Sequence, residues 1–290
     1  MTTSSTSDIK TVGVVGCGLM GSGIAEVCAR AGVETRVFEV SPDAVRAGRA
    51  RIEDSLSRAV QRGRMDSEAQ AAALGSLSFT TDLADFADCD LAIEAAPEKE
   101  EAKREIITAL DKVMPGPQAV IASNTSSIPI ARLATVTARP ARVIGLHFFN
   151  PVPTLRLVEI IPSVLTDDAT SLRAHAFASG PLDRHVIRAK DRAGFVVNAL
   201  LIPYITSAVR MYEAGHASAE DIDAGMVRGC AHPMGPLALA DHIGLDTTLA
   251  IAESLYEEFR EPLYAPPPLL ARMVDAGHLG RKTGRGFHRY

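Results

Sequence analysis

The sequence predicts an α/β fold in which a doubly wound sheet is followed by an all-helical C-terminal domain. Three observations lead to this prediction. Strand-like and helix-like stretches alternate up to about residue 150, a glycine-rich turn joins the first strand to the first helix, and no clear strand pattern follows residue 191. We therefore expect two domains, residues 1–189 and 190–290.

The composition is that of a folded protein. The 290 residues are 47% apolar and 22% charged, which is ample for a packed core and argues against disorder. The 30 basic and 35 acidic side chains give a net charge of −5. The overall basic footprint of a nucleic-acid-binding protein is therefore lacking, and no nucleic-acid partner is expected.

The cysteines predict neither disulfides nor a metal site. None of Cys17, Cys28, Cys89 and Cys230 forms a C-x-x-C pair, and none has histidines at metal-ligand spacing. They are interpreted as reduced, small apolar residues in a cytoplasmic protein.

The sequence predicts no membrane association. Residues 1–8 are polar, lack the apolar stretch of a secretion signal and are expected to form a frayed tail. The longest charge-free stretch, residues 193–209, is short for a membrane span and contains Asn198, Pro203 and Tyr204. A buried helix is the favoured interpretation of this stretch.

The chain opens with a strand, a glycine turn, a helix and a second strand. The β-branched run from Lys10 to Val15 is typical of a buried parallel strand. A helix is expected over residues 19–31, with Gly32 as its C-cap, and a second strand over residues 34–40.

The same alternation continues to residue 161. Ser41 followed by Pro42 is a helix start signal, and a long polar helix is expected from there through about Gly63. Further helices are expected at 67–74, 99–113 and 130–137, and strands at 77–80, 91–95, 119–123, 143–149 and 155–161. In the second domain, helices are expected at 194–214, 218–228 and 245–259.

The glycine turn carries the first functional signal. Residues 16–21, GCGLMG, fit the pattern G-x-G-x-x-G, which is weak when it stands alone. Here it ends a strand, opens a helix and has Glu39 eighteen residues after its last glycine, at the end of the next strand. That context matches the dinucleotide-binding fingerprint of a Rossmann-type domain. The alternative is a glycine-rich turn without a ligand.

Each position of the fingerprint has a physical role. Gly16 allows the tight turn, Gly18 lets a pyrophosphate approach the backbone, and Gly21 lets helix and strand pack closely. The helix N-terminus meets the negative charge of the pyrophosphate. The predicted cofactor-binding residues here are Gly16, Gly18, Leu19, Met20, Gly21 and Glu39.

Glu39 predicts the choice of cofactor. A carboxylate at this position accepts hydrogen bonds from the adenosine ribose hydroxyls and repels a 2′-phosphate. The next residues, Val40, Ser41 and Pro42, supply no compensating arginine. NAD is therefore expected in preference to NADP, although NADP is possible.

Two apolar strands each contain one residue of unusual polarity. His147 lies in the expected strand 143–149 and Glu159 in the expected strand 155–161. A hairpin centred on Pro153 places the two opposite one another. A buried carboxylate needs a partner, and a histidine beside it gains basicity and a fixed tautomer. The pair suits a general base that removes a proton from an alcohol; the alternative is a structural His–Glu pair.

Longer motifs point to one enzyme family. They are VGVVGCGLMGSGIA at 12–25, SNTSSIPI at 123–130, GLHFFNPVPTLRLVEI at 145–160, HPMGPLALADHIGLD at 232–246 and GRKTGRGF at 280–287. With these motifs the chain resembles the (S)-3-hydroxyacyl-CoA dehydrogenases, and most closely their bacterial 3-hydroxybutyryl-CoA branch, over about residues 9–290. The resemblance implies interconversion of 3-hydroxyacyl-CoA and 3-oxoacyl-CoA with a nicotinamide cofactor, in fatty acid metabolism and β-oxidation. It also implies a homodimer formed through the helical domain.

The resemblance assigns roles to individual residues. It implies that His147 is the catalytic base, Glu159 its orienting partner, and Ser126 and Asn198 the polar residues that hold the substrate oxygen. The cofactor contacts it implies are Glu98, Lys103, Ser126, Asn150 and Lys282. The coenzyme A contacts it implies are Ser55 and Arg62. Taken singly, these residues also fit plainer roles, such as a capping serine or a solvated helix face.

The chain departs from the family pattern at three positions. Glu39 stands where the family usually has Asp, and Arg62 where it commonly has Lys, so the sign of the charge is kept at both. Ala193 replaces the usual proline before the long helix, which puts the rigidity of the hinge between the domains in doubt.

Two alternative functions remain open. One is a related sugar-acid dehydrogenase of the gulonate type, which shares the GLHFFNP core. Arg62 and Ser55 favour a coenzyme A substrate instead. The other is a non-catalytic, crystallin-like structural protein. The argument against it is that the residues with implied catalytic roles are intact, namely His147, Glu159, Ser126 and Asn198.

Overall fold

The computed structural model describes residues 7–290. The chain divides into two compact units, Met1–Asp191 and Arg192–Tyr290. Of the expected polar tail, residues 1–6 lie outside the described residues. For the last two residues the expectation is wrong, because Ser7 is buried and Asp8 forms an ion pair with Arg173.

The first unit is built on one eight-stranded sheet in the order β3-β2-β1-β4-β5-β6-β7-β8. The strands are β1 (Thr11–Val15), β2 (Glu34–Phe38), β3 (Leu77–Thr80), β4 (Leu91–Glu94), β5 (Val120–Ser123), β6 (Val143–Phe148), β7 (Leu157–Ile161) and β8 (His185–Arg188). The six strands from β3 to β6 are parallel, β7 is antiparallel to β6, and β8 is parallel to β7. This is the doubly wound α/β sheet that the alternation of elements predicted.

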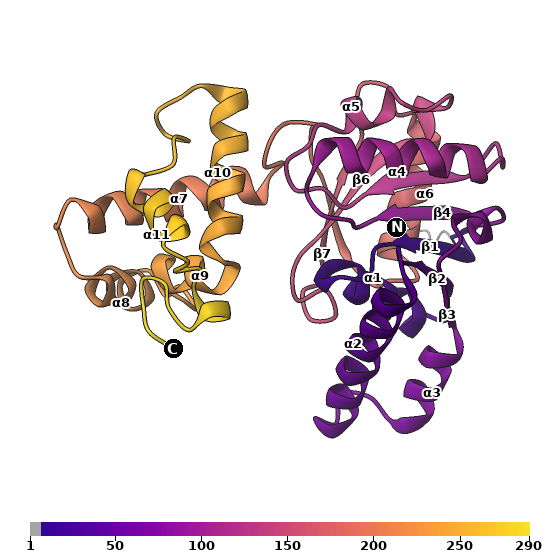
Figure 1. Cartoon of the computed structure of the whole chain (residues 1–290), viewed down its shortest axis with the longest axis horizontal. Helices are drawn as coiled ribbons and strands as arrows, with labels where there is room; N and C mark the ends of the chain where they lie inside the picture. Colours follow the sequence, from indigo (N-terminus) through magenta and orange to yellow (C-terminus); the bar gives the residue numbers. More distant parts are fainter. Residues whose placement is uncertain (1–6) are drawn as a thin grey trace, which may run out of the picture. The chain divides into compact units, whose positions relative to one another are not determined.

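Helices cover both faces of this sheet. They are α1 (Leu19–Arg30), α2 (Pro42–Gln61), α3 (Ser67–Gly75), α4 (Glu100–Val113), α5 (Ile130–Ala134) and α6 (Asp168–Ser179), with short 3₁₀ turns η1 (Leu83–Phe86) and η2 (Pro140–Arg142). Figure 1 shows α4 and α5 on one side of the strands and α1 on the other. Side chains alternate between the two faces of a strand, so β1 presents apolar residues to the helices on both sides of the sheet. A Cβ on Gly13 would lie 2.3 Å from the ring of Phe86, whereas Val12 and Val14 on the opposite face belong to the core under α1.

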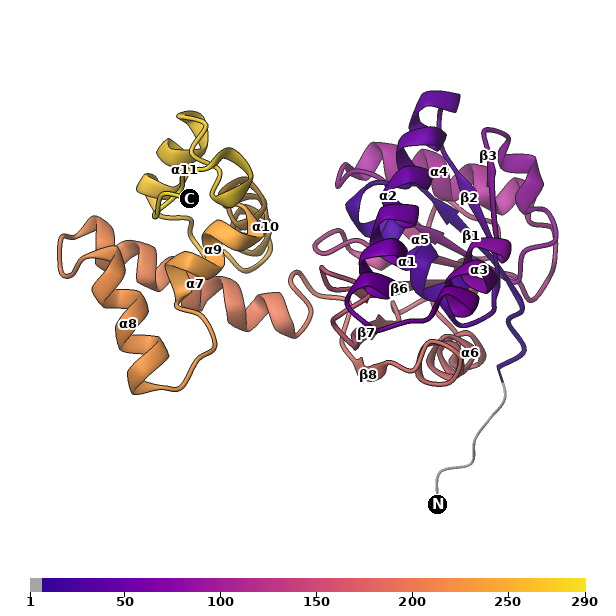
Figure 2. The same cartoon turned by 90° about the horizontal axis from the view of Figure 1, so that it is seen from below.

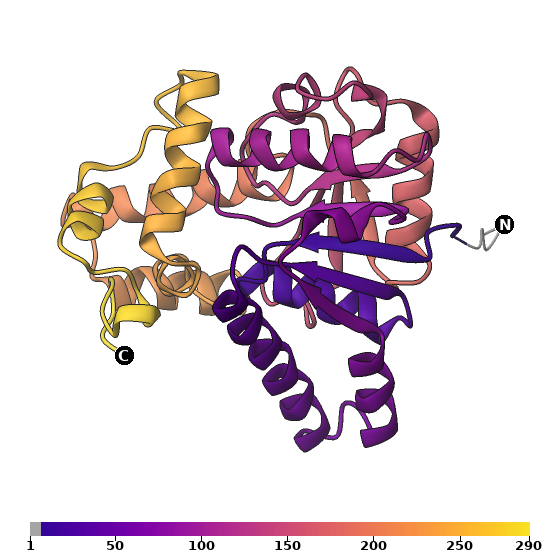
Figure 3. The same cartoon turned by 45° about the vertical axis from the view of Figure 1, so that its right-hand side comes forward.

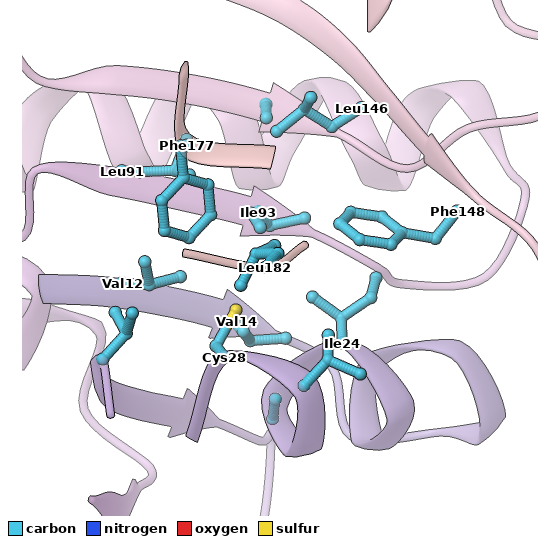
Figure 4. Packing of buried hydrophobic residues seen from close by; sticks show 14 of the residues in the cluster. Val12, Val14, Ile24, Cys28, Leu91, Ile93, Leu146, Phe148, Phe177 and Leu182 are labelled. Atoms are coloured by element: carbon cyan, nitrogen blue, oxygen red, sulfur yellow. The ribbon is translucent and has the colours of Figure 1, made fainter. Parts of the chain in front are cut away.

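The larger core lies on the α1 side and also includes α6. Figure 4 shows side chains from β1, β4 and β6 meeting Ile24 and Cys28 of α1 and Phe177 of α6. All of these side chains are at most 2% exposed. Leu182, just after α6, reaches the same cluster, so the chain entering β8 is anchored in the core.

Neither α6 nor β8 was predicted from the sequence. The apolar residues of α6 are mostly alanines mixed with polar residues, so the helical period is weak, although Asp167 caps the helix by accepting from the Thr170 amide at 2.7 Å. Strand β8 is only four residues long and lies at the edge of the sheet beside α6 (Figure 2).

Helices α2 and α3 run side by side away from the strands, as Figure 3 shows. The cap that begins α2 is the predicted one, since the Ser41 hydroxyl accepts from the Ala44 amide at 3.2 Å. Along α2 only Gly48, Ile52 and Leu56 are buried, at a spacing of four residues that marks one helix face. The remaining faces of this long helix are largely polar and available for a ligand.

The second unit is all-helical, as predicted, but contains more helices than expected. They are α7 (Val197–Glu213), α8 (Ala219–Gly229), α9 (Pro236–Ile243), α10 (Leu245–Phe259) and α11 (Pro268–Asp275), with a 3₁₀ turn η3 (Arg281–Thr283). The sequence did not predict α9 and α11, which have eight residues each. Both start with a proline, which is usually interpreted as a helix breaker but is also favoured at the first position of a helix. Among the described residues no helix is long and apolar enough to cross a membrane.

Two helix boundaries differ from the prediction for local reasons. Helix α7 starts at Val197 rather than 194, because Gly194 and Phe195 have φ angles of +73° and +49°. Helix α5 ends at Ala134 rather than 137, where the Thr135 and Thr137 hydroxyls donate to backbone carbonyls and compete with the helix.

Buried carboxylates hold the short helices and the chain end of the second unit together. The two oxygens of Asp223 accept from the Leu237 and Ala238 amides at 2.8 and 2.9 Å, which caps α9. Asp241, 1% exposed, accepts from the Phe287 and His288 amides at 2.9 Å each.

Candidate active site

The glycine turn after β1 has the conformation that its glycines allow. Gly16 has φ +90°, and a Cβ on Gly21 would lie 1.8 Å from the Gly16 carbonyl oxygen. Gly18 is the N-cap of α1, and apart from its two chain neighbours no described residue has an atom within 4 Å of where its Cβ would stand. The first amides of α1 therefore open onto free space, which fits a phosphate group.

Glu39 is held beside this turn. It follows directly after β2, which ends at Phe38 rather than at residue 40 as expected. The Cys17 amide donates to Glu39 Oε1 at 2.5 Å, and the Val40 amide lies 3.3 Å from Oε2. The carboxylate is thus fixed between the ends of β1 and β2, where the fingerprint places the adenosine ribose.

A cation that the sequence reasoning missed lies on the same turn. Arg51 of α2 donates from Nη1 to the Cys17 carbonyl at 2.6 Å. No local pattern in the sequence marked Arg51. The structure shows that this face of α2 packs on the turn, since a Cβ on Gly48, one helical turn before Arg51, would lie 2.6 Å from Cys17 Sγ. Glu39 therefore binds the backbone amide of Cys17, and Arg51 binds the backbone carbonyl of the same residue.

The cysteines are not reactive groups of this site. Burial, more than the nearby Glu39 charge, raises the pKa of the Cys17 thiol to about 12. Burial likewise raises the pKa of Cys28 and of Cys89 to about 12. Cys230 is exposed, unlike the other three, and none of the four forms a disulfide within the described residues.

His147 and Glu159 form the pair that the hairpin predicted. The antiparallel register of β6 and β7 places them opposite one another, and His147 Nδ1 lies 2.7 Å from Glu159 Oε2. Glu159 is fully buried and His147 is 6% exposed, with the Phe149 ring 4.5 Å from the imidazole ring. A carboxylate in this position fixes the orientation and tautomer of the imidazole.

A second buried charge pair lies at the end of β4. Lys103 Nζ donates to Glu94 Oε1 and Oε2 at 2.7 and 2.9 Å and to the Ala96 carbonyl at 3.1 Å. Its ammonium is also 3.3 Å from Glu98 Oε2. The three N–H donors of Lys103 thus have acceptors within the chain, and its contact with a cofactor stays a prediction.

Glu98 accepts several hydrogen bonds from the turn that follows β5. Its Oε1 accepts from the Thr125 hydroxyl at 2.6 Å and from the Ser126 and Ser127 amides at 2.8 and 3.2 Å. Burial alone would raise the pKa of Glu98, but Lys103 and these hydrogen bonds outweigh it and hold the pKa below its ordinary value. Glu98 is therefore an anion that shapes the loop containing Ser126.

Side-chain hydrogen bonds connect the end of β5 to the ends of β6 and β4. The Asn124 side-chain oxygen accepts from the Phe148 amide at 2.8 Å, and Ser123 donates to Glu94 Oε2 at 2.6 Å. The sequence analysis missed Glu94 and Asn124. Glu94 carried the same signal as His147, a single ionisable residue in an apolar strand, and could have been found by it.

These groups share one edge of the sheet. The carboxyl ends of β1, β2, β4, β5 and β6 lie at the same edge because these strands are parallel. The structure thus brings the glycine turn, Glu39, Glu98, Ser126 and His147 to the edge where doubly wound sheets bind ligands. Asn150 lies exposed just after β6, on the same edge.

The remaining predicted residues lie elsewhere in the chain. Ser55 and Arg62 are on the outer part of α2, with Ser55 half-buried and Arg62 exposed at the end of the helix. Asn198 is buried in the first turn of α7. Lys282 is paired with Asp246, its Nζ 2.6 Å from both carboxylate oxygens. Among residues 7–290 no group of three or more His, Cys, Asp or Glu side chains could hold a metal ion.

Comparison with known proteins agrees with this geometry. The model of the 3-hydroxyacyl-CoA dehydrogenase NAD binding domain matches residues 11–192, and that of the 3-hydroxyacyl-CoA dehydrogenase C-terminal domain matches residues 194–290. A 3-hydroxybutyryl-CoA dehydrogenase of Mycobacterium tuberculosis is 57% identical over 282 residues, 97% of this chain and 99% of that protein. The mitochondrial hydroxyacyl-coenzyme A dehydrogenase of Sus scrofa is 40% identical over 97% of this chain and 91% of its own.

Solved structures are similar over the same length. The crystal structure of FadB2 from M. tuberculosis has a TM-score of 0.96 at 57% identity, covering 97% of this chain and 99% of that one. The (S)-3-hydroxybutyryl-CoA dehydrogenase PaaH1 from Ralstonia eutropha has a TM-score of 0.93 at 46% identity, covering 98% and 99%.

Proposed function

Because the chain belongs to the 3-hydroxyacyl-CoA dehydrogenase family, we propose that it interconverts (S)-3-hydroxyacyl-CoA and 3-oxoacyl-CoA with NAD(H) as cofactor. The short-chain substrate 3-hydroxybutyryl-CoA is the expected one, since relatives at 57% and 48% identity are named for it. The observation that carries the proposal is the buried His147–Glu159 pair, 2.7 Å apart, on the edge of the sheet that also bears the glycine turn.

The glycine turn and Glu39 fit a dinucleotide. The open space at Gly18 and the first amides of α1, including those of Leu19 and Met20, suit a pyrophosphate. Glu39, already an acceptor for the Cys17 amide, would accept from the adenosine ribose hydroxyls. When bound, the nicotinamide ring supplies the hydride acceptor or donor.

His147 is the group that handles the proton. Its Nδ1 faces Glu159, and we assign to Nε2 the contact with the 3-hydroxyl of the substrate. We assign it the removal of that proton during oxidation and its return during reduction. Glu159 holds the ring in this orientation and favours the imidazolium that forms.

The other predicted residues bind and orient. Ser126 and Asn198 hold the substrate oxygen, while Asn150, Glu98, Lys103 and Lys282 contact the cofactor. For Glu98 the loop geometry supports a role in shaping this surface, since it orders the serine turn through four hydrogen-bond donors or more. The pairing of Lys282 with Asp246 fixes the position of its ammonium.

The coenzyme A moiety is assigned to the outer part of α2. Ser55 and the exposed Arg62 offer a hydroxyl and a cation on a helix whose outer faces are polar. A homodimer formed through the helical unit, a place in the cytoplasm and a role in fatty acid β-oxidation complete the proposal.

A steady-state assay of the purified protein tests the proposal. We expect oxidation of NADH at 340 nm with acetoacetyl-CoA and no turnover of a sugar acid such as gulonate with NAD. The matched control is His147→Gln, which keeps the size of the side chain. Turnover of gulonate alone would assign the chain to the sugar-acid branch, and turnover of neither substrate would favour a structural protein.

A further inference from the structure

A cavity of about 420 Å³ lies outside the proposed active site. It is open to the surface and is bordered by the end of α1, the connector before β7 and the segment before β8. The residues that give it its chemistry are Arg30, Thr154, Arg156, Asp183 and Arg184. None of them belongs to the groups assigned above to cofactor or substrate.

Three guanidinium groups and one carboxylate line this cavity, and a second carboxylate, Glu26, is buried beside it. Arg30 pairs with Glu26 at 3.3 Å, and Arg156 pairs with Asp183. Arg184 has no carboxylate partner among the described residues. Its Nη1 donates to the Leu155 carbonyl at 3.1 Å. One positive charge is thus left without a matching anion.

Arg184 also has a hydrogen-bond donor without an acceptor. Its Nε is buried, and it is the one buried side-chain nitrogen or oxygen among residues 7–290 for which no hydrogen-bond partner is found. Buried donors are nearly always paired, and an exception calls for a missing ligand, ion or water. Burial, followed by the charges of Arg156 and Arg30, holds the pKa of Arg184 below its ordinary value, and the nearby Glu26 charge only partly offsets them.

The walls of the cavity are fixed. Leu182 is buried in the core (Figure 4), and the Asp183 and Arg184 amides donate to Gly180 and Ala178 carbonyls at 3.1 and 2.9 Å. On the other side, the Thr154 amide donates to the Pro151 carbonyl at 3.0 Å. The arginines are therefore presented by ordered backbone from two directions, which lowers the entropy cost of binding.

We propose that this cavity binds a phosphate group, either as free phosphate or as part of a small phosphomonoester. Guanidinium groups present paired N–H donors that match phosphate oxygens, and several arginines converging from different segments suit a tetrahedral anion. The volume lies within the range of small-molecule pockets and leaves room for an organic body beside the phosphate. The proposal is independent of the dehydrogenase activity, because it concerns binding alone.

Titration calorimetry with inorganic phosphate, on the whole protein without cofactor, tests the site. Arg184→Met removes the unmatched charge and should weaken phosphate binding at least tenfold. Asp183→Asn removes a competing carboxylate and should tighten it several-fold. Asn is tolerated at that position, where φ is +50°. The control Arg132→Met removes an exposed arginine that pairs with Glu100 and should leave the affinity unchanged.

The two substitutions give opposite signs, which separates this site from phosphate binding at the glycine turn. Equal affinity in the wild type and in Arg184→Met overturns the proposal, as does the absence of phosphate binding in the wild type at 20 mM. If Arg184→Met does not fold, Asp183→Asn decides, and an affinity no tighter than that of the wild type overturns it.

A second titration with glycerol 3-phosphate identifies the source of the phosphate. Tighter binding of the ester than of inorganic phosphate, lost in Arg184→Met, supports a phosphomonoester as the natural ligand. Equal binding of the two, lost in the same variant, supports free phosphate.

Discussion

Glu94 and Lys103 form an ion pair in which neither side chain is more than 1% exposed. The pair connects the end of β4 with the first turn of α4. Through the 3.3 Å contact of Lys103 with Glu98, it also reaches the serine turn after β5. The loop after β4, the first turn of α4 and the serine turn after β5 are thus connected through one buried cation.

Lys103→Met should therefore destabilise the protein strongly. The substitution keeps the length of the side chain but leaves the buried Glu94 carboxylate without a counter-charge, which costs about 3–5 kcal/mol. Urea unfolding at pH 7 measures this loss. The double variant with Glu94→Gln removes the stranded charge, and we expect it to recover a large part of the stability. A loss below 1 kcal/mol for the single variant would contradict the role of the pair.

His147→Gln should lower kcat by roughly 10²- to 10⁴-fold, the usual contribution of a general base. Glutamine has a similar size but cannot accept the alcohol proton. The dissociation constant of NADH, followed by fluorescence, should change little. A kcat within a few-fold of the wild-type value would exclude His147 as the base.

Glu159→Gln tests whether the carboxylate acts through the histidine. Its removal takes away the carboxylate that fixes the tautomer and orientation of His147, so kcat should fall while the dissociation constant of NADH changes little. Steady-state kinetics and NADH fluorescence measure the two quantities. An unchanged kcat would leave Glu159 a purely structural partner.

Glu39 and Arg51 should control the choice of cofactor in opposite directions. Wild type is expected to prefer NADH to NADPH, and Glu39→Ala should narrow the preference, because the repulsion of a 2′-phosphate is lost. Arg51→Ala should widen it, since a cation 2.6 Å from the Cys17 carbonyl is removed from the same turn.

The measurement for this pair is kcat/KM for both cofactors at one saturating concentration of acetoacetyl-CoA. A wild-type preference for NADPH would show that Glu39 does not meet the ribose. Parallel changes in the two variants would show that Arg51 acts on the fold of the turn rather than on the cofactor.

Arg62→Ala should raise KM for acetoacetyl-CoA and leave KM for NADH unchanged. Arg62 is exposed at the end of α2, so its removal should not affect stability, whereas a phosphate contact of the coenzyme would be lost. Arg132→Ala, on the exposed surface of α5, serves as the control. An equal rise in both KM values would place the effect in the fold rather than in the coenzyme A site.

The predictions from the sequence were most accurate where the structure is determined by residues that are close together in the chain. The glycine turn, the cap at Ser41 and the register that pairs His147 with Glu159 each follow from short segments whose geometry depends little on distant parts of the chain. The doubly wound sheet followed from the alternation of elements and is confirmed by the strand order.

The sequence predicted poorly where tertiary contacts override weak local preference. Helix α6 has an indistinct apolar period and is stabilised by the burial of Phe177 in the core, which no local pattern reveals. Arg51 resembles the other exposed arginines of α2, and only the packing of Gly48 on Cys17 shows which of them reaches the glycine turn. The roles proposed for Ser126, Asn198 and Lys103 rest on the family resemblance, because no local pattern singles these residues out.

The carboxylate of Asp241 has a consequence for engineering of the chain. Besides the amides of Phe287 and His288 it accepts from the Tyr290 hydroxyl at 3.2 Å, so much of its hydrogen bonding comes from the final segment. Deletion of residues 287–290 would leave an almost wholly buried anion without these donors. The helical unit would then be weakened from within, so these residues are a structural part of it.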